Sequence, residues 1–116
     1  NEFQQVILNL ITNSIYAINK RREKLNDKYL QGNIELRIEQ EGGVCIILYS
    51  DNGGGIESAV IDRIFDKHFT TKGGEGSGIG LAVSKKIIQD LGGTIEVRNI
   101  EEGVSFIVKL DSFEVR

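Results

Sequence analysis

The sequence of 116 residues contains no proline, methionine or tryptophan, and it has one cysteine and one histidine. A single cysteine excludes an internal disulfide and fits a reducing compartment. One cysteine and one histidine are also too few for a zinc cluster built from these residue types. No apolar run approaches the roughly 18–20 residues of a membrane-spanning helix. The formal net charge of −3 gives no electrostatic case for nucleic-acid binding.

Two kinds of hydrophobic periodicity alternate along the chain, which has the length of one domain. The predicted helices span residues 3–29, with a charged tail, 57–65 and 79–91. The predicted strands span residues 33–39, 44–51, 94–100 and 104–113. The strand over 44–51 is the most continuously apolar, so we expect it to be central and covered on both faces.

The predicted order is helix, two strands, two helices and two strands, which does not suit repeated βαβ units. It favours an α+β fold, a two-layer sandwich of a mixed, mainly antiparallel sheet with helices on one face. We also expect residues 1–116 to be one domain of a longer protein, because the sequence opens in a helical pattern and has no methionine.

The first candidate site feature is the pair Asn9 and Asn13 in "NLITN". Residues four apart on a helix are rotated by about 40°, so both side chains face the same way. An amide carbonyl is a neutral oxygen ligand that suits magnesium already bound to nucleotide phosphates. The alternative is a pair of capping or surface amides.

The second feature is "YSDNGGGI", in which Asp51 ends the apolar strand. A partly buried carboxylate there can accept a hydrogen bond from an exocyclic amine such as that of adenine. The glycines allow close approach of a flat base, and Ile56 offers an apolar wall. An ordinary aspartate-led turn is the alternative.

The third feature is "GGEGSGIG" over residues 73–80, directly before a predicted helix. Its glycines match neither the Walker-type phosphate loop nor the G-x-G-x-x-G of dinucleotide folds. Backbone amides leading into a helix N-terminus nevertheless attract anions, and Ser77 adds a hydroxyl. A flexible linker is the simpler interpretation.

Taken in order, these segments resemble the catalytic ATP-binding domain of bacterial sensor histidine kinases over essentially the whole chain. "QQVILNLITNSIYAI" is similar to the asparagine box, and "DNGGGI" to the first glycine box. "IFDKHFTTK" resembles the phenylalanine box, "GEGSGIGLAVSKKIIQDLGGTIEV" the second glycine box, and "EGVSFIVKL" the closing strand.

The resemblance implies a Bergerat-type ATP-binding fold and the cofactors ATP and Mg²⁺. By position, Asn13 would be the magnesium ligand, Asn9 would lie near the phosphates, and Asp51 would bind the adenine amine. Lys72 would be a candidate for reaching the γ-phosphate, with a solvated lysine as the alternative. The lid of the family would run from about residue 65 to 77. The nucleotide-binding set that the resemblance implies is Asn9, Asn13, Asp51, Gly53, Gly55, Ile56, Thr71, Gly76, Ser77, Gly78, Ile79, Gly80, Leu81 and Ser105.

Two departures from the family patterns bear on the chemistry. Relatives that hydrolyse ATP carry a glutamate four residues before the magnesium asparagine, whereas this chain has Asn9, an amide that cannot act as a general base. This difference favours phosphoryl transfer over hydrolysis. The only histidine, His68, lies within the phenylalanine box, so we expect a lid or packing role for it rather than that of phosphoacceptor.

The function that the resemblance implies is binding of Mg·ATP and transfer of the γ-phosphoryl group to a histidine on a separate dimerisation domain. A response regulator would be the downstream partner, and the domain itself would be monomeric and cytoplasmic, in a parent protein with or without a membrane anchor. Two alternatives stay open: an ATP hydrolase of the gyrase or MutL type, and a non-catalytic nucleotide-sensing or protein-interaction module.

Overall fold

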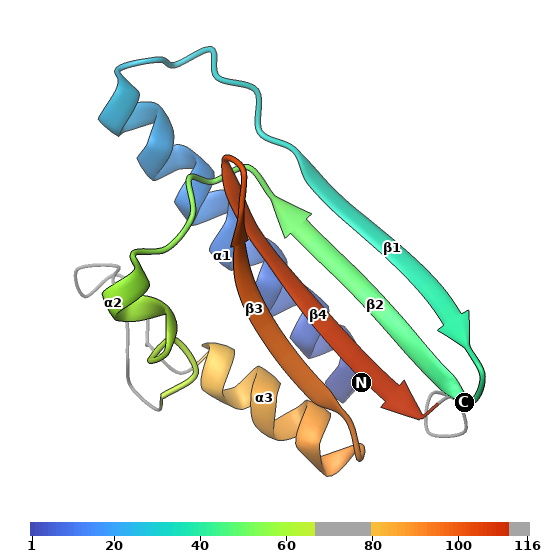
Figure 1. Cartoon of the computed structure of the whole chain (residues 1–116). Coiled ribbons are helices and arrows are strands. Elements are labelled where there is room, and N and C mark those ends of the chain that lie inside the picture. The colour runs from blue at the N-terminus through green and yellow to red at the C-terminus, as the bar shows by residue number, and fades with distance from the viewer. Residues whose placement is uncertain (67–79, 112–116) are drawn as a thin grey trace.

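The computed structural model describes residues 1–66 and 80–111, whose elements follow the predicted order (Figure 1). The helices are α1 (Glu2–Leu25), α2 (Ser58–Ile61) and α3 (Gly80–Asp90). The strands are β1 (Ile34–Glu41), β2 (Val44–Asp51), β3 (Thr94–Ile100) and β4 (Gly103–Asp111). None of these three helices is long and apolar enough to cross a membrane.

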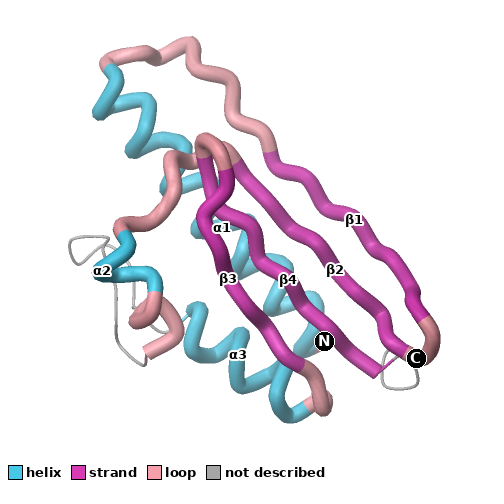
Figure 2. The backbone as a smooth tube through the Cα atoms, viewed as in Figure 1, coloured by secondary structure: helices cyan, strands magenta, loops and turns pink. Residues whose placement is uncertain are grey.

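The four strands form one sheet in the order β1-β2-β4-β3, and every neighbouring pair is antiparallel. Helices α1 and α3 lie on the same face of this sheet (Figure 2). The predicted two-layer α+β architecture is therefore confirmed, and the sheet over the described residues is antiparallel throughout rather than mixed.

Local signals account for both ends of α1. The Asn1 side chain accepts a hydrogen bond from the Gln4 amide, and the Gln4 side chain bonds back to Asn1, which forms a capping box. At the other end Asn26 adopts a left-handed conformation, with φ of 52°, and its amide bonds to carbonyls of the last turn. The helix thus ends at Leu25, inside the charged tail that the sequence extends to residue 29.

The core lies between the helices and one face of the sheet. The inward side chains of β2, from Cys45 to Asp51, are buried in alternation, and Cys45 is a buried thiol as predicted. On the opposite face Ile46 and Leu48 stay partly exposed. The prediction that this strand is covered on both faces is therefore wrong. Its continuous apolar run does not distinguish a doubly covered strand from one whose outer face is apolar and half-exposed.

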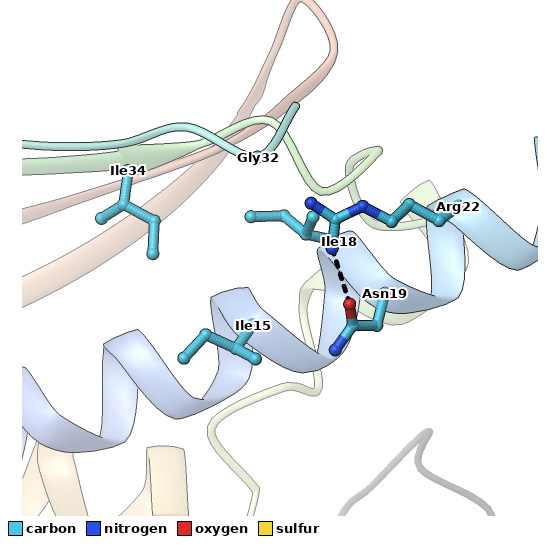
Figure 3. A pocket seen from close by; sticks show the side chains of 6 residues that line it. All are labelled: Ile15, Ile18, Asn19, Arg22, Gly32 and Ile34. Carbon is cyan, nitrogen blue, oxygen red and sulfur yellow. Dashed lines mark hydrogen bonds between the residues drawn. The ribbon is translucent and has the colours of Figure 1, made fainter. Parts of the chain in front are cut away.

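The helix layer does not extend over β1. Its side chains Ile34, Leu36 and Ile38 share the helix-side face with the buried residues of β2, because they pair with Asp51, Tyr49 and Ile47. They are nevertheless 39%, 48% and 66% exposed. This strip borders a hollow of about 350 Å³ between α1 and the start of β1 (Figure 3), which is lined by Ile15, Ile18, Asn19, Arg22, Gly32 and Ile34. None of the predicted site residues lines that hollow.

Candidate functional site

One face of α1 carries the candidate site. Asn9, Asn13, Ala17 and Arg21 follow one another at four-residue steps, so they lie along the same side of the helix. Asn9 contacts the first residue of α3, while Ala17 and Arg21 contact the segment that follows β2. Asn13 therefore lies, along α1, between the contact with the start of α3 and the contacts with the aspartate–glycine turn after β2.

The two asparagines differ in what their amides bind. The Asn9 amide nitrogen donates to the Gly80 carbonyl and to the Ser84 hydroxyl, at 3.1 Å each, and its oxygen accepts from Gln5 at 2.9 Å. Asn9 thus ties α1 to the beginning of α3. No described residue hydrogen-bonds to the half-buried side chain of Asn13. Within the described part of the chain, the Asn13 carbonyl keeps its capacity as an oxygen ligand.

Asp51 ends β2 with only 7% of its surface exposed. Its Oδ2 accepts a hydrogen bond from the Ser14 hydroxyl at 2.5 Å, and its Oδ1 accepts from the Gly53 amide at 2.9 Å. An ionised carboxylate has about four acceptor positions, so acceptor capacity remains for a ligand. Held on both sides, this carboxylate suits recognition of a donor such as an amine.

Ser14 connects Asp51 to a buried phenol. Its Oγ lies 2.7 Å from the hydroxyl oxygen of Tyr49, and both residues are 1% exposed. Burial raises the pKa of the Tyr49 phenol above its ordinary value; the hydrogen bond with Ser14 opposes this shift, and the charge of Asp51 adds to it. The phenol therefore stays protonated, as a hydrogen-bond donor, at neutral pH.

The turn over residues 52–56 is fixed by contacts at both ends. Arg21 donates to the Asn52 carbonyl at 2.7 Å. The Asn99 side chain accepts a hydrogen bond from the Ile56 amide at 2.8 Å and donates one to the Ile56 carbonyl at 2.7 Å, so it pairs with both backbone groups of this residue. Between them the Gly54 amide donates to the Glu102 carbonyl at 2.9 Å. The hairpin between β3 and β4 and helix α1 therefore hold this turn from two sides.

Glycine is required in this turn for two different reasons. A Cβ at Gly53 would lie 2.6 Å from the Ala17 Cβ, so α1 packs directly on the backbone there. Gly55 has φ of 78°, in the left-handed region that other residues rarely adopt. The backbone freedom that the sequence places after Asp51 is thus used for close packing and for a turn.

Ser105 does not belong to this cluster. In the β2–β4 register Asp51 pairs with Val104, while Ser105 pairs with Ser50 and, across β3, with Arg98. Because side chains alternate between the faces of a strand, Ser105 lies on the face opposite to Asp51. The structure therefore does not bring Ser105 together with Asp51, and Val104 is the β4 residue that faces the helices beside Asp51.

The remaining predicted residues divide into two groups. Gly80 meets Asn9, and Ile56 and Leu81 are partly buried and pack against the core. The others lie outside the described residues; these are Thr71, Lys72, Gly76, Ser77, Gly78 and Ile79, together with His68 and most of the predicted lid.

Sequence reasoning missed four residues of the cluster, namely Ser14, Tyr49, Arg21 and Asn99. Two of them carry a readable signal. Ser14 follows Asn13 directly in the sequence. Tyr49 precedes Asp51 by two positions, so strand alternation places the side chains of Tyr49 and Asp51 on one face of β2. Arg21 and Asn99 act through long-range contacts that no local pattern marks.

The donor set fits a nucleotide with its magnesium ion. Among the described residues, no group of three or more histidine, cysteine, aspartate or glutamate side chains could hold a metal by itself. A magnesium ion that keeps water and phosphate ligands needs few protein ligands, and Asn13 offers one neutral oxygen. Asp51 has the acceptor capacity that binding a base with an exocyclic amine needs, because it retains acceptor positions after accepting from Ser14 and Gly53.

Comparison with known proteins identifies the family of the chain. The two-component sensor PprA of Pseudomonas aeruginosa is 36% identical over 115 residues, which cover 95% of this chain and 12% of that protein. The sensor histidine kinase ZraS of Salmonella typhimurium is 39% identical over 108 residues, covering 91% of this chain and 21% of that protein. A nucleotide-free catalytic domain of the histidine kinase ThkA matches with a TM-score of 0.77 at 30% identity, covering 96% of this chain and 66% of that one. The family model described as histidine kinase-, DNA gyrase B- and HSP90-like ATPase matches residues 1–113, and the chain belongs to this family.

Proposed function

We propose that the chain binds Mg·ATP and supplies the γ-phosphoryl group to a histidine on a separate dimerisation domain of the same protein. The observation that carries the proposal is the buried Asp51 carboxylate at the end of β2, held by Ser14 and Gly53 with acceptor capacity to spare. It lies beside the asparagine-bearing face of α1, which also reaches Gly80, the first residue of α3. Family membership and the likeness to sensor kinases support the same reading.

In this proposal the base and the phosphates are bound by different parts of the chain. Asp51 accepts a hydrogen bond from the adenine amine, and Gly53, Gly55 and Ile56 line the base. Gly80 and Leu81, with residues outside the described part, surround the phosphates; these are Thr71, Gly76, Ser77, Gly78 and Ile79. Lys72, which also lies outside the described part, is the candidate for contacting the γ-phosphate.

Asn13 is the residue we assign to magnesium. Bound with the nucleotide, the ion neutralises charge on the phosphates and orients them. Asn9 acts differently from a metal ligand, because its amide is engaged by Gly80 and Ser84. Its role is to hold the start of α3 against α1, so that the N-terminus of that helix is positioned for the phosphates.

Transfer is favoured over hydrolysis by the chemistry of position 9. Water attack on ATP is assisted by a group that orients or deprotonates the water, and an amide cannot take that proton. Asn9 also donates both of its hydrogen bonds to protein groups. The attacking group is therefore expected from outside this chain, on a partner domain, with catalysis supplied by positioning and charge neutralisation.

The experiment is a calorimetric titration of the chain with ATP in the presence of Mg²⁺, for the wild type and for Asp51→Asn. The substitution keeps the shape but removes the charge of a buried acceptor, and a charge-assisted hydrogen bond is worth about 1.5–3 kcal/mol. We expect the dissociation constant to rise about tenfold to a hundredfold. The matched control is Asp90→Asn, at the far end of α3, where the carboxylate makes only an exposed ion pair with Lys86.

Two results would overturn the proposal. One is a wild-type chain that fails to bind ATP at millimolar concentration, which would favour an interaction module without nucleotide. The other is steady release of phosphate by the chain alone, which would favour a hydrolase. Transfer itself is tested by adding the dimerisation domain of the parent protein and following label from γ-³²P-ATP into its histidine.

A further inference from the structure

We propose that Ser14 and Tyr49 are positioning residues that make the site selective for a ligand amine. They hold the Asp51 carboxylate in place, and their own hydroxyl protons are used in hydrogen bonds within the protein, so neither hydroxyl can donate to the ligand. This inference rests on the proposed function, in which the site binds an adenine nucleotide. It concerns a different property, namely the discrimination between a base with an exocyclic amine and a base without one.

The direction of each hydrogen bond in this network follows from proton counting. Asp51 as a carboxylate can only accept, so the single proton of the Ser14 hydroxyl points to Oδ2. Ser14 then has no proton left for Tyr49, and the Tyr49 hydroxyl must donate to Ser14 Oγ. The order is therefore Tyr49 to Ser14 to Asp51, with each hydroxyl polarising the next.

Both hydroxyls are held by packing as well as by hydrogen bonds. Tyr49 and Asp51 project from the same face of β2, and Ser14 reaches them from α1. The Tyr49 ring meets Phe106 edge-on, with 6.4 Å between the ring centroids. Because Ser14 and Tyr49 are each 1% exposed, water cannot easily replace either partner.

The consequence for a ligand lies in which groups remain free. A serine hydroxyl beside a binding carboxylate could rotate to donate to a ligand carbonyl, and the site would then accept more than one base. Here that proton is committed to Asp51, and the second carboxylate oxygen already accepts from the Gly53 amide. What Asp51 presents to a ligand is acceptor capacity only. An amine satisfies it, whereas a carbonyl or a bare C–H at the same place leaves a buried carboxylate without its partner.

The experiment measures the dissociation constants of ATP and of purine riboside triphosphate, which lacks the exocyclic amine, with Mg²⁺ present. We expect the wild-type chain to prefer ATP, and Ser14→Ala to reduce this preference about threefold to tenfold, the equivalent of one buried hydrogen bond. Tyr49→Phe keeps the ring and should reduce it less, since Ser14 can still donate. In the double variant that carries Ser14→Ala and Tyr49→Phe, the loss of preference for ATP should equal that of Ser14→Ala alone, because Tyr49 acts only through Ser14.

Two substitutions serve as matched controls. Ser50→Ala removes a serine hydroxyl next to Asp51 but on the opposite face of β2. Tyr29→Phe removes a phenol that is 82% exposed. Neither should change the ratio of the two dissociation constants.

The outcomes separate this inference from the function on which it rests. An unchanged ratio in both Ser14→Ala and Tyr49→Phe, with lowered thermal stability, would overturn it and leave a structural role only. A wild-type chain that binds both nucleotides equally would also overturn it while leaving nucleotide binding intact. If Ser14→Ala does not fold, the ratio for Tyr49→Phe decides, because that variant preserves the ring packing. Absence of ATP binding by the wild type would overturn the proposed function itself.

Discussion

Asn9 in the first helix and Gly80 at the start of the third are joined by a hydrogen bond of 3.1 Å although they lie 71 positions apart. The same amide nitrogen also reaches the Ser84 hydroxyl, one turn further along α3. Since Ser84 is fully buried, this contact fixes both the position and the rotation of α3 relative to α1. The position that holds a glutamate in ATP-hydrolysing relatives is thus occupied here by a residue that joins two helices.

Asn9→Ala removes both of these hydrogen bonds and leaves the Ser84 hydroxyl without this partner. We expect the free energy of unfolding to fall by about 1–2 kcal/mol, with weaker ATP binding because the start of α3 is no longer held. Thermal unfolding followed by circular dichroism and the ATP titration measure the two effects. Gln5→Ala is the control, because it removes only the hydrogen bond from Gln5 to Asn9 within α1. Equal stability of the two variants would contradict the linking role.

Gly53→Ala tests the packing of α1 on the turn after β2. The added Cβ would lie 2.6 Å from the Ala17 Cβ and 3.2 Å from the Ala17 carbonyl carbon, so either the helix or the turn must move. Overpacking of this kind costs about 1–3 kcal/mol, and ATP affinity should fall with it. At Gly43 a Cβ meets nothing within 4 Å, so Gly43→Ala should leave affinity unchanged. If both variants bind ATP as the wild type does, the turn is not a rigid part of the site.

Asn99→Ala tests the hydrogen bonds by which β3 holds the same turn, on the side opposite to α1. It removes two hydrogen bonds to Ile56, of 2.8 and 2.7 Å, so the Ile56 amide should exchange its hydrogen faster. We expect ATP affinity to fall about threefold to tenfold, since binding must then order the turn. Asn99→Asp retains the acceptor for the Ile56 amide but loses the donor to the Ile56 carbonyl. Its ATP affinity should lie between those of the wild type and Asn99→Ala. Unchanged exchange at Ile56 in Asn99→Ala would be the contrary result.

The general course of the fold could be predicted from the sequence because hydrophobic periodicity and glycine-rich turns mark helices and strands locally. The exposure of the outer face of β2 could not be predicted, because Ile46 and Leu48 look like core residues in the sequence but face outward in the sheet. The face on which Ser105 lies could not be predicted for a related reason. A shift of one position along β4 exchanges the two faces of the sheet, and only the register with Asp51 decides between Val104 and Ser105.

Candidates for the site were identifiable from the sequence where they are residue types within short motifs, such as Asp51 before its glycines and the spacing of Asn9 and Asn13. The residues that hold those groups in place were not. Arg21 contacts the carbonyls of Asn52 and Glu102, and such contacts between distant segments arise from the folded arrangement. A serine in a helix, such as Ser14, has many solvated equivalents, and only its burial beside Tyr49 and Asp51 distinguishes it.

Asn13→Ala should abolish the magnesium dependence of ATP binding. In the proposed function the Asn13 amide oxygen is the ligand that α1 offers to the metal, and alanine offers none. Calorimetry with ATP in Mg²⁺ and in EDTA measures the difference, which should be large for the wild type and small for the variant. Asn19→Ala, on the exposed face of the same helix, controls for loss of an asparagine from α1. Undiminished magnesium-dependent binding by Asn13→Ala would remove this residue from the metal site.

Tyr49 should make the stability of the protein fall at alkaline pH. Burial raises the pKa of its phenol in the folded state above the ordinary value of 10.0, so the unfolded chain loses this proton first as the pH rises. The stability that Tyr49 contributes is therefore fully present below about pH 10 and decreases as the pH rises from there through the folded-state pKa, by at most about 1.4 kcal/mol per pH unit. Tyr49→Phe lacks this ionisation, so the difference in unfolding free energy between wild type and Tyr49→Phe should be constant from pH 8 to 9.5 and shift in favour of the variant above pH 10. Denaturant unfolding at these pH values measures it, and a difference that stays constant up to pH 11 would mean that the phenol is not held in its protonated form by the fold.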